Sequence, residues 1–263
     1  MADEQGIIGF LEYSKEQKMK NKAKLLVVMF SLAAVAGLAS AVSIGNYPAV
    51  LSGDTAVLQF NGMGDNRSAT YAYAPNARGQ YQHTGNTYAG ELTYTVDGKS
   101  GYTMWCVDIY QNTSSSKVTY NEALLSDSSY LSALDTLYYQ YDQYTQANAN
   151  SSTKLKNAAA AFQMTMWELA FEKGDYNLND GWFKVTSTSD ANALGNLWLA
   201  NIGFIAYVNY EKTVWYNNKS QDVIEFGRMI PPVSSVPEPL TMLSMAVAFS
   251  AAGRYVAKRL KKS

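Results

Sequence analysis

The chain contains one cysteine, Cys106, in a segment whose residues alternate as they do in a strand. The local sequence is Trp105-Cys106-Val107-Asp108, with the cysteine on the less apolar of the two strand faces. A single cysteine cannot form an intrachain disulfide. The thiol is therefore either a nucleophile or a small apolar side chain in the core, and both interpretations stay open at this point.

Gln163 is the most informative polar residue of a second segment, an alanine-rich helix predicted at about residues 154–173. At 100° per residue, Gln163 shares the less charged face with Trp167, whereas Glu168 and Glu172 lie on the opposite face. If this carboxamide is buried it needs a hydrogen-bond partner, for which a backbone group is the ordinary choice. A thiol would be the reactive choice, because an aligned thiol gains an effective molarity of about 10⁵ M.

The two segments together resemble the thioester domains of bacterial surface adhesins, of the Cys-Gln or TQXA type. That family combines an aromatic-Cys-hydrophobic strand with an alanine-rich helix containing Gln-x-x-hydrophobic-Trp, here Gln163 to Trp167. The resemblance implies that Cys106 and Gln163 condense with loss of ammonia, and that the thioester captures a nucleophile from a partner surface. It also implies supporting roles for Trp105 and Trp167. Phe162 departs from the family, which usually has Thr there, and the helical insertion is short.

Other polar clusters match a functional pattern less well. The single histidine, His83, has no matched serine or aspartate, which argues against a Ser-His-Asp triad. Residues 175–181 begin like a calcium loop, but the glycine comes one position late, so we expect an oxygen-rich turn. Glu168 and Glu172 are expected to be solvated rather than an acid/base pair. We therefore expect no enzymatic activity, no metal and no cofactor.

The N-terminal 41 residues have the order of a secretory signal peptide. Five lysines precede an apolar stretch at 25–38, and Ala39-Ser40-Ala41 supplies the small residues that signal peptidase requires. We expect cleavage after Ala41, and Met19 is the expected true start. An uncleaved anchor is the alternative, which is disfavoured because the apolar stretch is shorter than the ~20 residues of a membrane span.

The last 27 residues, 237–263, resemble the PEP-CTERM sorting tail that exosortases recognise. Pro237, Glu238 and Pro239 precede an apolar stretch at 240–252, and five basic residues follow. The resemblance implies that a hydrophobic tail helix holds the exported protein transiently in the inner membrane until an exosortase removes it. A plain C-terminal membrane anchor is the alternative. A Pro/Ser linker at 231–236 separates the tail from the rest of the chain.

The region between the two ends, 42–230, predicts one β-rich α+β domain. Strand-like alternation at 55–60 and 91–96 precedes helical periodicity at 131–141, at 154–173 and after Asp190. Strand-like segments then return at 205–210, 213–216 and 222–226. This order predicts a β-sandwich or partial barrel with a helical insertion or cap, flanked by the signal helix and the tail helix.

These patterns predict an exported cell-surface or extracellular-matrix protein that attaches covalently through a thioester. Its partners would be signal peptidase, an exosortase and an unknown surface nucleophile or polysaccharide. The region 42–230 has more acidic than basic residues, which argues against a nucleic-acid partner. The alternative function is a non-covalent structural or carbohydrate-binding protein of a biofilm or exopolysaccharide matrix.

Overall fold

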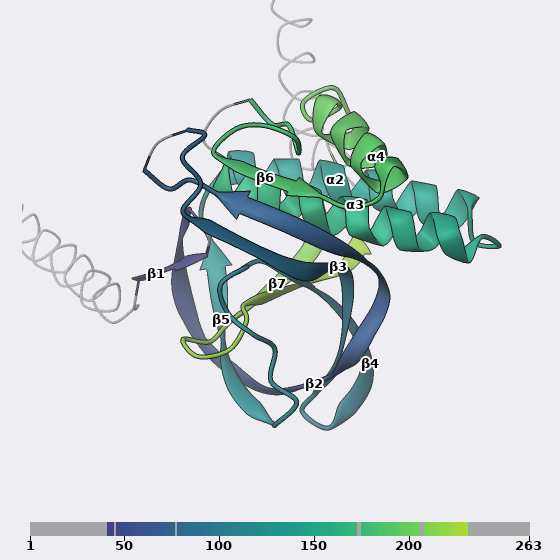
Figure 1. The fold of residues 1–263 in the computed structure, drawn as a ribbon. Coiled ribbons are helices and arrows are strands. Elements are labelled where there is room, and N and C mark those ends of the chain that lie inside the picture. Colours follow the sequence, from purple (N-terminus) through teal and green to yellow (C-terminus); the bar gives the residue numbers. More distant parts are fainter. Residues whose placement is uncertain (1–40, 45, 77, 173–174, 206–207, 231–263) are drawn as a thin grey trace, which may run out of the picture. The chain divides into compact units, whose positions relative to one another are not determined.

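The computed structural model describes residues 41–44, 46–76, 78–172, 175–205 and 208–230 (Figure 1). Met19 and Ala39 of the signal segment lie outside the described residues, as does the whole sorting motif of Pro237, Glu238 and Pro239. Ala41 is described and is the first residue of a strand. In the described part of the chain, no helix has the length and apolar character needed to cross a membrane.

The strands belong to one sheet in which every pairing is antiparallel. In chain order they are β1 (Ala41–Ile44), β2 (Tyr47–Tyr73), β3 (His83–Val96), β4 (Lys99–Cys106), β5 (Val118–Leu125), β6 (Phe183–Thr186), β7 (Tyr210–Tyr216) and β8 (Val223–Met229). The predicted β-rich α+β class is confirmed. The strand expected at 205–210 begins later than predicted, because only Tyr210 of its described residues is paired.

The length of β2 lets the sheet close on itself. Its first part pairs with β5 and its second part with β3, and the sequence of neighbours β3-β4-β8-β7-β5 returns to β2. Register shifts mark where β2 bends, one of them between Met63 and Asn66. Gly90 lies opposite Asn66 with φ +149°, and a Cβ there would collide with the backbone of Asp65. Glycine is therefore required at this bend.

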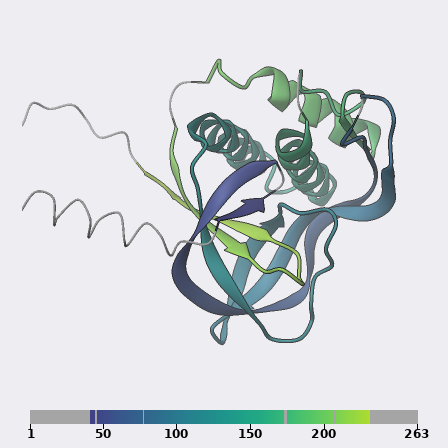
Figure 2. The ribbon, with the colours of Figure 1, turned by 90° about the vertical axis from the view of Figure 1, so that its left-hand side faces the viewer.

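The described residues form three helices: two follow β5, and the third lies between β6 and β7. They are α2 (Ser128–Ala147), α3 (Ser152–Phe171) and α4 (Ser189–Ala200). Each begins at a polar N-cap, namely Asp127, Ser151 or Thr188, whose side chain accepts a backbone N–H from the first turn. Figures 1 and 2 show α2 and α3 side by side across one end of the closed sheet, with α4 against them.

Helix α3 is buried on all sides from Asn157 to Phe171. It packs against β2 and β3 and is covered by α2 and α4, so no face of it reaches solvent. The prediction that Glu168 and Glu172 are solvated is therefore wrong, since their exposed fractions are 0% and 6%. The alanine-rich sequence 158–161 allows this close packing on several sides, as expected of a helix that is apolar all round.

Candidate functional site

Cys106, at the end of β4, and Gln163, in the middle of α3, contact each other directly. Gln163 Oε1 accepts the backbone N–H of Cys106 at 2.9 Å, and Gln163 Nε2 donates to the Cys106 carbonyl oxygen at 2.7 Å. Both residues are buried. The fold thus brings together the two residues that the sequence predicts to react, although they are 57 positions apart.

The end of a strand pairing explains why a carboxamide fits here. Strand β4 pairs with β3 only as far as Leu92 and Met104, while Cys106 pairs with Val223 of β8 on its other side. The remaining backbone groups of Cys106 are buried and need partners. The amide of Gln163 offers one donor and one acceptor in the spacing that a further strand would have offered.

The thiol of Cys106 has its own hydrogen bonds. Its Sγ donates to the carbonyl oxygen of Asp108 at 3.0 Å, and Gln221 Nε2 donates to Sγ. Gln221 Nε2 also donates to that same Asp108 oxygen at 3.1 Å. Burial raises the pKa of the Cys106 thiol, which the indole of Trp167 only partly counters, so the thiol is neutral at physiological pH.

Sequence reasoning missed Gln221. It lies in the turn between β7 and β8, and only the pairing of Cys106 with Val223 brings it to the thiol. The turn itself is held by Asn217, whose side chain accepts the N–H groups of Lys219 and Ser220. No local motif marks Gln221, because its role depends on a contact 115 residues away.

A cavity of about 230 Å³ joins these side chains. Cys106, Gln163, Trp167 and Gln221 all line it. Its other walls come from β2, β3 and the loop after β4, and include Met63, Tyr71, Asn86, Thr87, Tyr88, Gly90, Leu92, Ile109, Gln111, Asn112 and Thr113. Trp167 thus lines the same cavity as Cys106 and Gln163, and its supporting role stays a prediction. The cavity is large enough for a small nucleophile to approach Gln163.

Trp105 lies away from this cavity. Its ring packs edge to face against Phe162 at 4.6 Å and against Tyr141 at 5.1 Å between ring centroids. The predicted difference between an apolar and a less apolar face of β4 is absent here, because Trp105 and Cys106 are both buried. Phe162 fills this aromatic cluster, in which Phe226 also takes part.

A carboxyl group close to the site has a strongly shifted pKa. Burial raises the pKa of Asp222 to about 7, and the nearby charge of Asp108 acts in the same direction. Asp222 Oδ1 accepts the N–H of Asn217 at 2.9 Å, and its backbone carbonyl accepts the N–H of Val107. A carboxyl group with this pKa exchanges protons readily at neutral pH.

Glu168 and Glu172 hold the loop that the sequence compared with a calcium site. Glu168 Oε1 accepts the N–H of Asn177 at 2.7 Å, and Glu172 Oε2 accepts those of Trp182 and Phe183. Burial raises the pKa of Glu168 to about 8. In these contacts backbone N–H groups donate to the carboxyl groups of Glu168 and Glu172, and the oxygen-rich turn at 175–181 stays a prediction. Within the described ranges, no three His, Cys, Asp or Glu side chains gather as metal ligands would.

Comparisons with known proteins add nothing to this geometry. No family model matches the chain, and neither curated proteins nor solved structures give a match.

Proposed function

We propose that this protein attaches itself covalently to a partner surface through an internal thioester between Cys106 and Gln163. The observation that carries the proposal is the direct contact of these two residues inside a cavity, in a chain with no other cysteine. The protein is an attachment module rather than an enzyme, because the thioester is consumed when it reacts. The closed sheet with its helical cap serves as a rigid barrel-like scaffold for the pair.

The chemistry of thioester formation balances without any further reactant. The thiol sulfur attacks Cδ of Gln163, and the negative charge that develops on Oε1 faces the backbone N–H of Cys106. The bond between Cδ and Nε2 then breaks, and ammonia leaves with the thiol proton. A carbon–sulfur bond has replaced a carbon–nitrogen bond, and no oxidation takes place.

Capture reverses the role of the sulfur. A hydroxyl or amine of the partner attacks Cδ of Gln163, the carbon–sulfur bond breaks, and Cys106 becomes a thiol again. Gln221 Nε2 donates to Sγ and stabilises the sulfur as it leaves.

The two ends of the chain support an extracellular location. We infer export by the signal segment, with cleavage by signal peptidase between Ala41 and Val42, and sorting by an exosortase at Pro237, Glu238 and Pro239. Cleavage there removes only Ala41 from β1. N-terminal sequencing of exported protein tests the first step, and a start at Met19 would contradict it. Replacing the three sorting residues should leave an uncleaved, membrane-held species in an exosortase-bearing host.

Intact mass and methylamine together test the thioester. The freshly purified protein should lack the mass of one ammonia, and methylamine should add to Gln163 while it frees one thiol. Cys106→Ala and Gln163→Ala should each abolish the reaction. Gln140→Ala is the matched control, because Gln140 is also a buried, hydrogen-bonded glutamine but belongs to α2. An intact mass equal to that of the unmodified sequence, together with full alkylation of Cys106, would instead favour the non-covalent matrix protein.

A further inference from the structure

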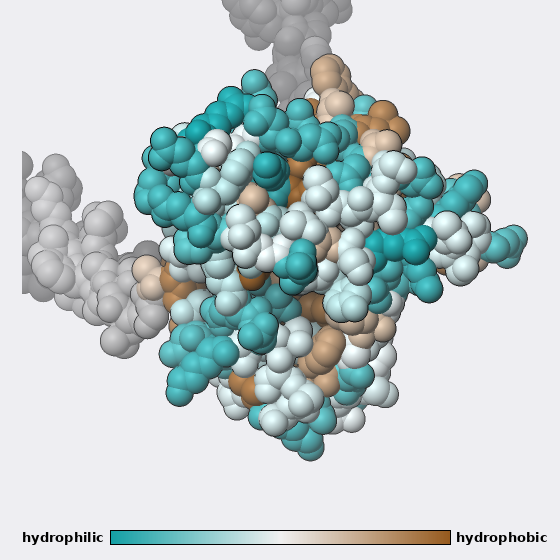
Figure 3. Space-filling model, viewed as in Figure 1, coloured by the Kyte–Doolittle hydropathy of each residue, from teal (hydrophilic) through white to brown (hydrophobic). Residues whose placement is uncertain are grey.

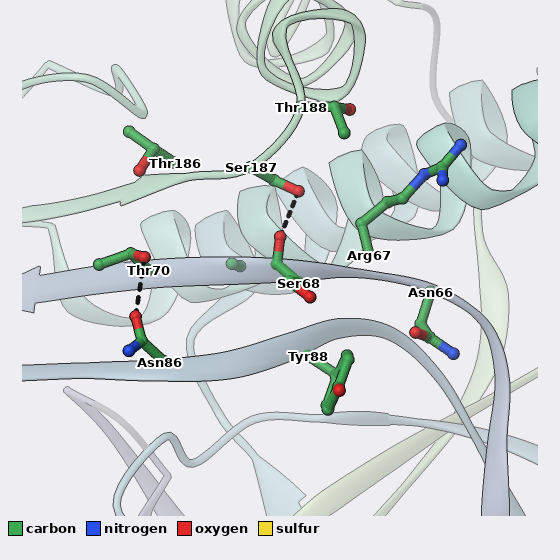
Figure 4. A pocket seen from close by; sticks show the side chains of 10 residues that line it. Asn66, Arg67, Ser68, Thr70, Asn86, Tyr88, Thr186, Ser187 and Thr188 are labelled. Carbon is green, nitrogen blue, oxygen red and sulfur yellow. Dashed lines mark hydrogen bonds between the residues drawn. The ribbon is translucent and has the colours of Figure 1, made fainter.

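A polar groove of about 800 Å³ runs over the outer face of β2, β3 and β6 (Figure 4). Strand register sets its floor: Thr70 of β2 lies between Asn86 of β3 and Thr186 of β6, and Ser68 lies opposite Tyr88. In Figure 3 this face of the molecule is predominantly hydrophilic. The complete lining is Asn66, Arg67, Ser68, Ala69, Thr70, Asn86, Tyr88, Thr186, Ser187 and Thr188.

The side chains of the groove suit a sugar. Among the described residues, Ser68 Oγ, Thr186 Oγ1 and Asn86 Nδ2 make no hydrogen bond to protein, so they are available to a ligand. Tyr88, beside them, is 60% exposed. Hydroxyl and amide groups next to an exposed aromatic ring recognise the two sides of a pyranose, its hydroxyls and its apolar face.

The charges of the groove argue against a lysine-bearing partner. No carboxylate lines it, and its single cation, Arg67, donates to Asn157 Oδ1 at 2.9 Å and to the Thr153 carbonyl at 3.3 Å. A protein amine would arrive as a cation and would find no opposite charge there. A hydroxyl nucleophile needs no such charge.

The groove shares Asn86 and Tyr88 of β3 with the cavity that Cys106 and Gln163 line. Residues 83–90 of β3 pair with β2 along one edge, whereas β4 joins the other edge only from Leu92 onward. In the described structure that second edge of 83–90 has no partner strand. A ligand that crosses the groove from β6 over β2 to β3 therefore reaches the rim of the cavity that holds Gln163.

We propose that this groove binds a linear glycan and presents one of its hydroxyl groups to the Gln163 carbonyl; the delivery step rests on the proposed thioester. The hydroxyl oxygen forms a bond to Cδ of Gln163, the carbon–sulfur bond breaks, and the hydroxyl proton passes to the Cys106 sulfur. The products are an ester-linked glycan and a free thiol.

Two glycan probes and a lysine peptide test the assignment on the purified full-length protein. Cellohexaose and hexagalacturonate should each be assayed for an ester adduct at Gln163 by intact mass and peptide mapping, with methylamine uptake measured in parallel. The yield of glycan adduct relative to methylamine adduct should fall about tenfold in Tyr88→Ala and in Thr186→Val. Tyr88→Trp should keep the ratio, because it retains a stacking ring. Thr119→Val, an exposed change on β5, is the matched control and should leave the ratio unaltered.

The outcomes separate this inference from the proposed function. Methylamine uptake without a glycan adduct, or capture of the lysine peptide alone, would overturn the groove assignment while the thioester stands. For the opposite case, Cys106→Ala cannot form a thioester but keeps the groove. If the wild-type protein never loses ammonia, the thioester and the delivery step are both overturned. Chemical-shift changes at Tyr88 when cellohexaose is added to Cys106→Ala would still support the groove as a glycan site.

Discussion

Two of the buried polar side chains of helix α3, Gln163 and Glu168, differ in how they are paired. Gln163 is neutral, and both atoms of its amide are hydrogen-bonded to the backbone of Cys106. Five residues later, Glu168 is a carboxyl group with one oxygen bonded to Asn177 and the other, Oε2, without a partner. One helix thus holds a fully paired amide beside a cavity and a half-paired acid beneath a loop.

The difference indicates two separate roles. The amide is readily buried because it replaces a missing strand, and both of its polar atoms are bonded to the backbone of Cys106. The acid is expensive to bury as an anion, which is why its pKa is raised to about 8. Glu168 therefore acts as a neutral clamp for the loop that begins near Asn177, and the chemistry that we propose belongs to the Gln163 end of the helix.

The largest expected effect comes from removing the paired amide. In a Cys106→Ala background, where no thioester can form, Gln163→Leu should lower the free energy of unfolding by about 2–6 kcal/mol. Two buried backbone groups of residue 106 lose their partners, each at a cost of about 1–3 kcal/mol. Urea unfolding measures the change. Gln146→Leu, an exposed glutamine change on α2, should stay within about 0.5 kcal/mol. A loss below about 1 kcal/mol at residue 163 would mean that the amide does not replace a strand.

The second effect is the pH dependence that Glu168 gives to stability. Its pKa rises from 4.5 to about 8 on folding, because the folded protein favours the neutral carboxyl group. The stabilisation from Glu168 is therefore complete below pH 4.5 and is lost as the pH rises towards 8. The free energy of unfolding should fall by about 1.4 kcal/mol per pH unit in this window. Glu168→Gln keeps an acceptor for Asn177 without the charge, and it should flatten the profile.

Asp222 provides a matched test of whether Glu168 causes this pH dependence of stability. Its pKa also rises, from 3.8 to about 7, so Asp222→Asn should remove a separate slope that ends one pH unit lower. Urea unfolding from pH 4 to 9 distinguishes the two variants. If Glu168→Gln keeps the wild-type slope between pH 7 and 8, Glu168 is already ionised in the folded protein and the clamp interpretation fails.

The sequence predicted the parts of this structure that depend on local pattern. The strand around Cys106 and the helix around Gln163 follow from alternation and periodicity. The solvation of Glu168 was predicted wrongly, since charge patterning assumes that a helix keeps one face in water. Here the loop near Asn177 lies over the Glu168 carboxyl group, and the sequence does not reveal this.

Gln221 and the groove escaped prediction for a different reason. Both depend on strand pairings between distant segments: the pairing of β4 with β8 brings the turn before β8 to the thiol, and that of β2 with β6 places Thr186 beside Thr70. The contacts span more than 100 residues and leave no periodic trace. The resemblance located Cys106 and Gln163, but it carried no information about which other side chain touches the sulfur.

The smallest expected effect concerns that third residue. Gln221→Leu should slow methylamine capture about tenfold, which corresponds to the loss of one hydrogen bond to the leaving sulfur. Thioester formation should still go to completion, because Cys106 and Gln163 keep their own contacts. The rate is measured by intact mass over time.

A purely structural role for Gln221 would have a different signature. Its amide also donates to the Asp108 carbonyl, so Gln221→Leu could act by loosening the strand end. In that case the urea midpoint would fall and hydrolysis by water would accelerate, because the cavity would open. A role in stabilising the sulfur predicts a different result.

Methylamine and water attack the same carbonyl and expel the same sulfur. If Gln221 stabilises the sulfur, the rates of methylamine capture and of hydrolysis should both fall by the same factor, while the unfolding midpoint changes little. Faster hydrolysis with a lowered midpoint would assign Gln221 to structure alone.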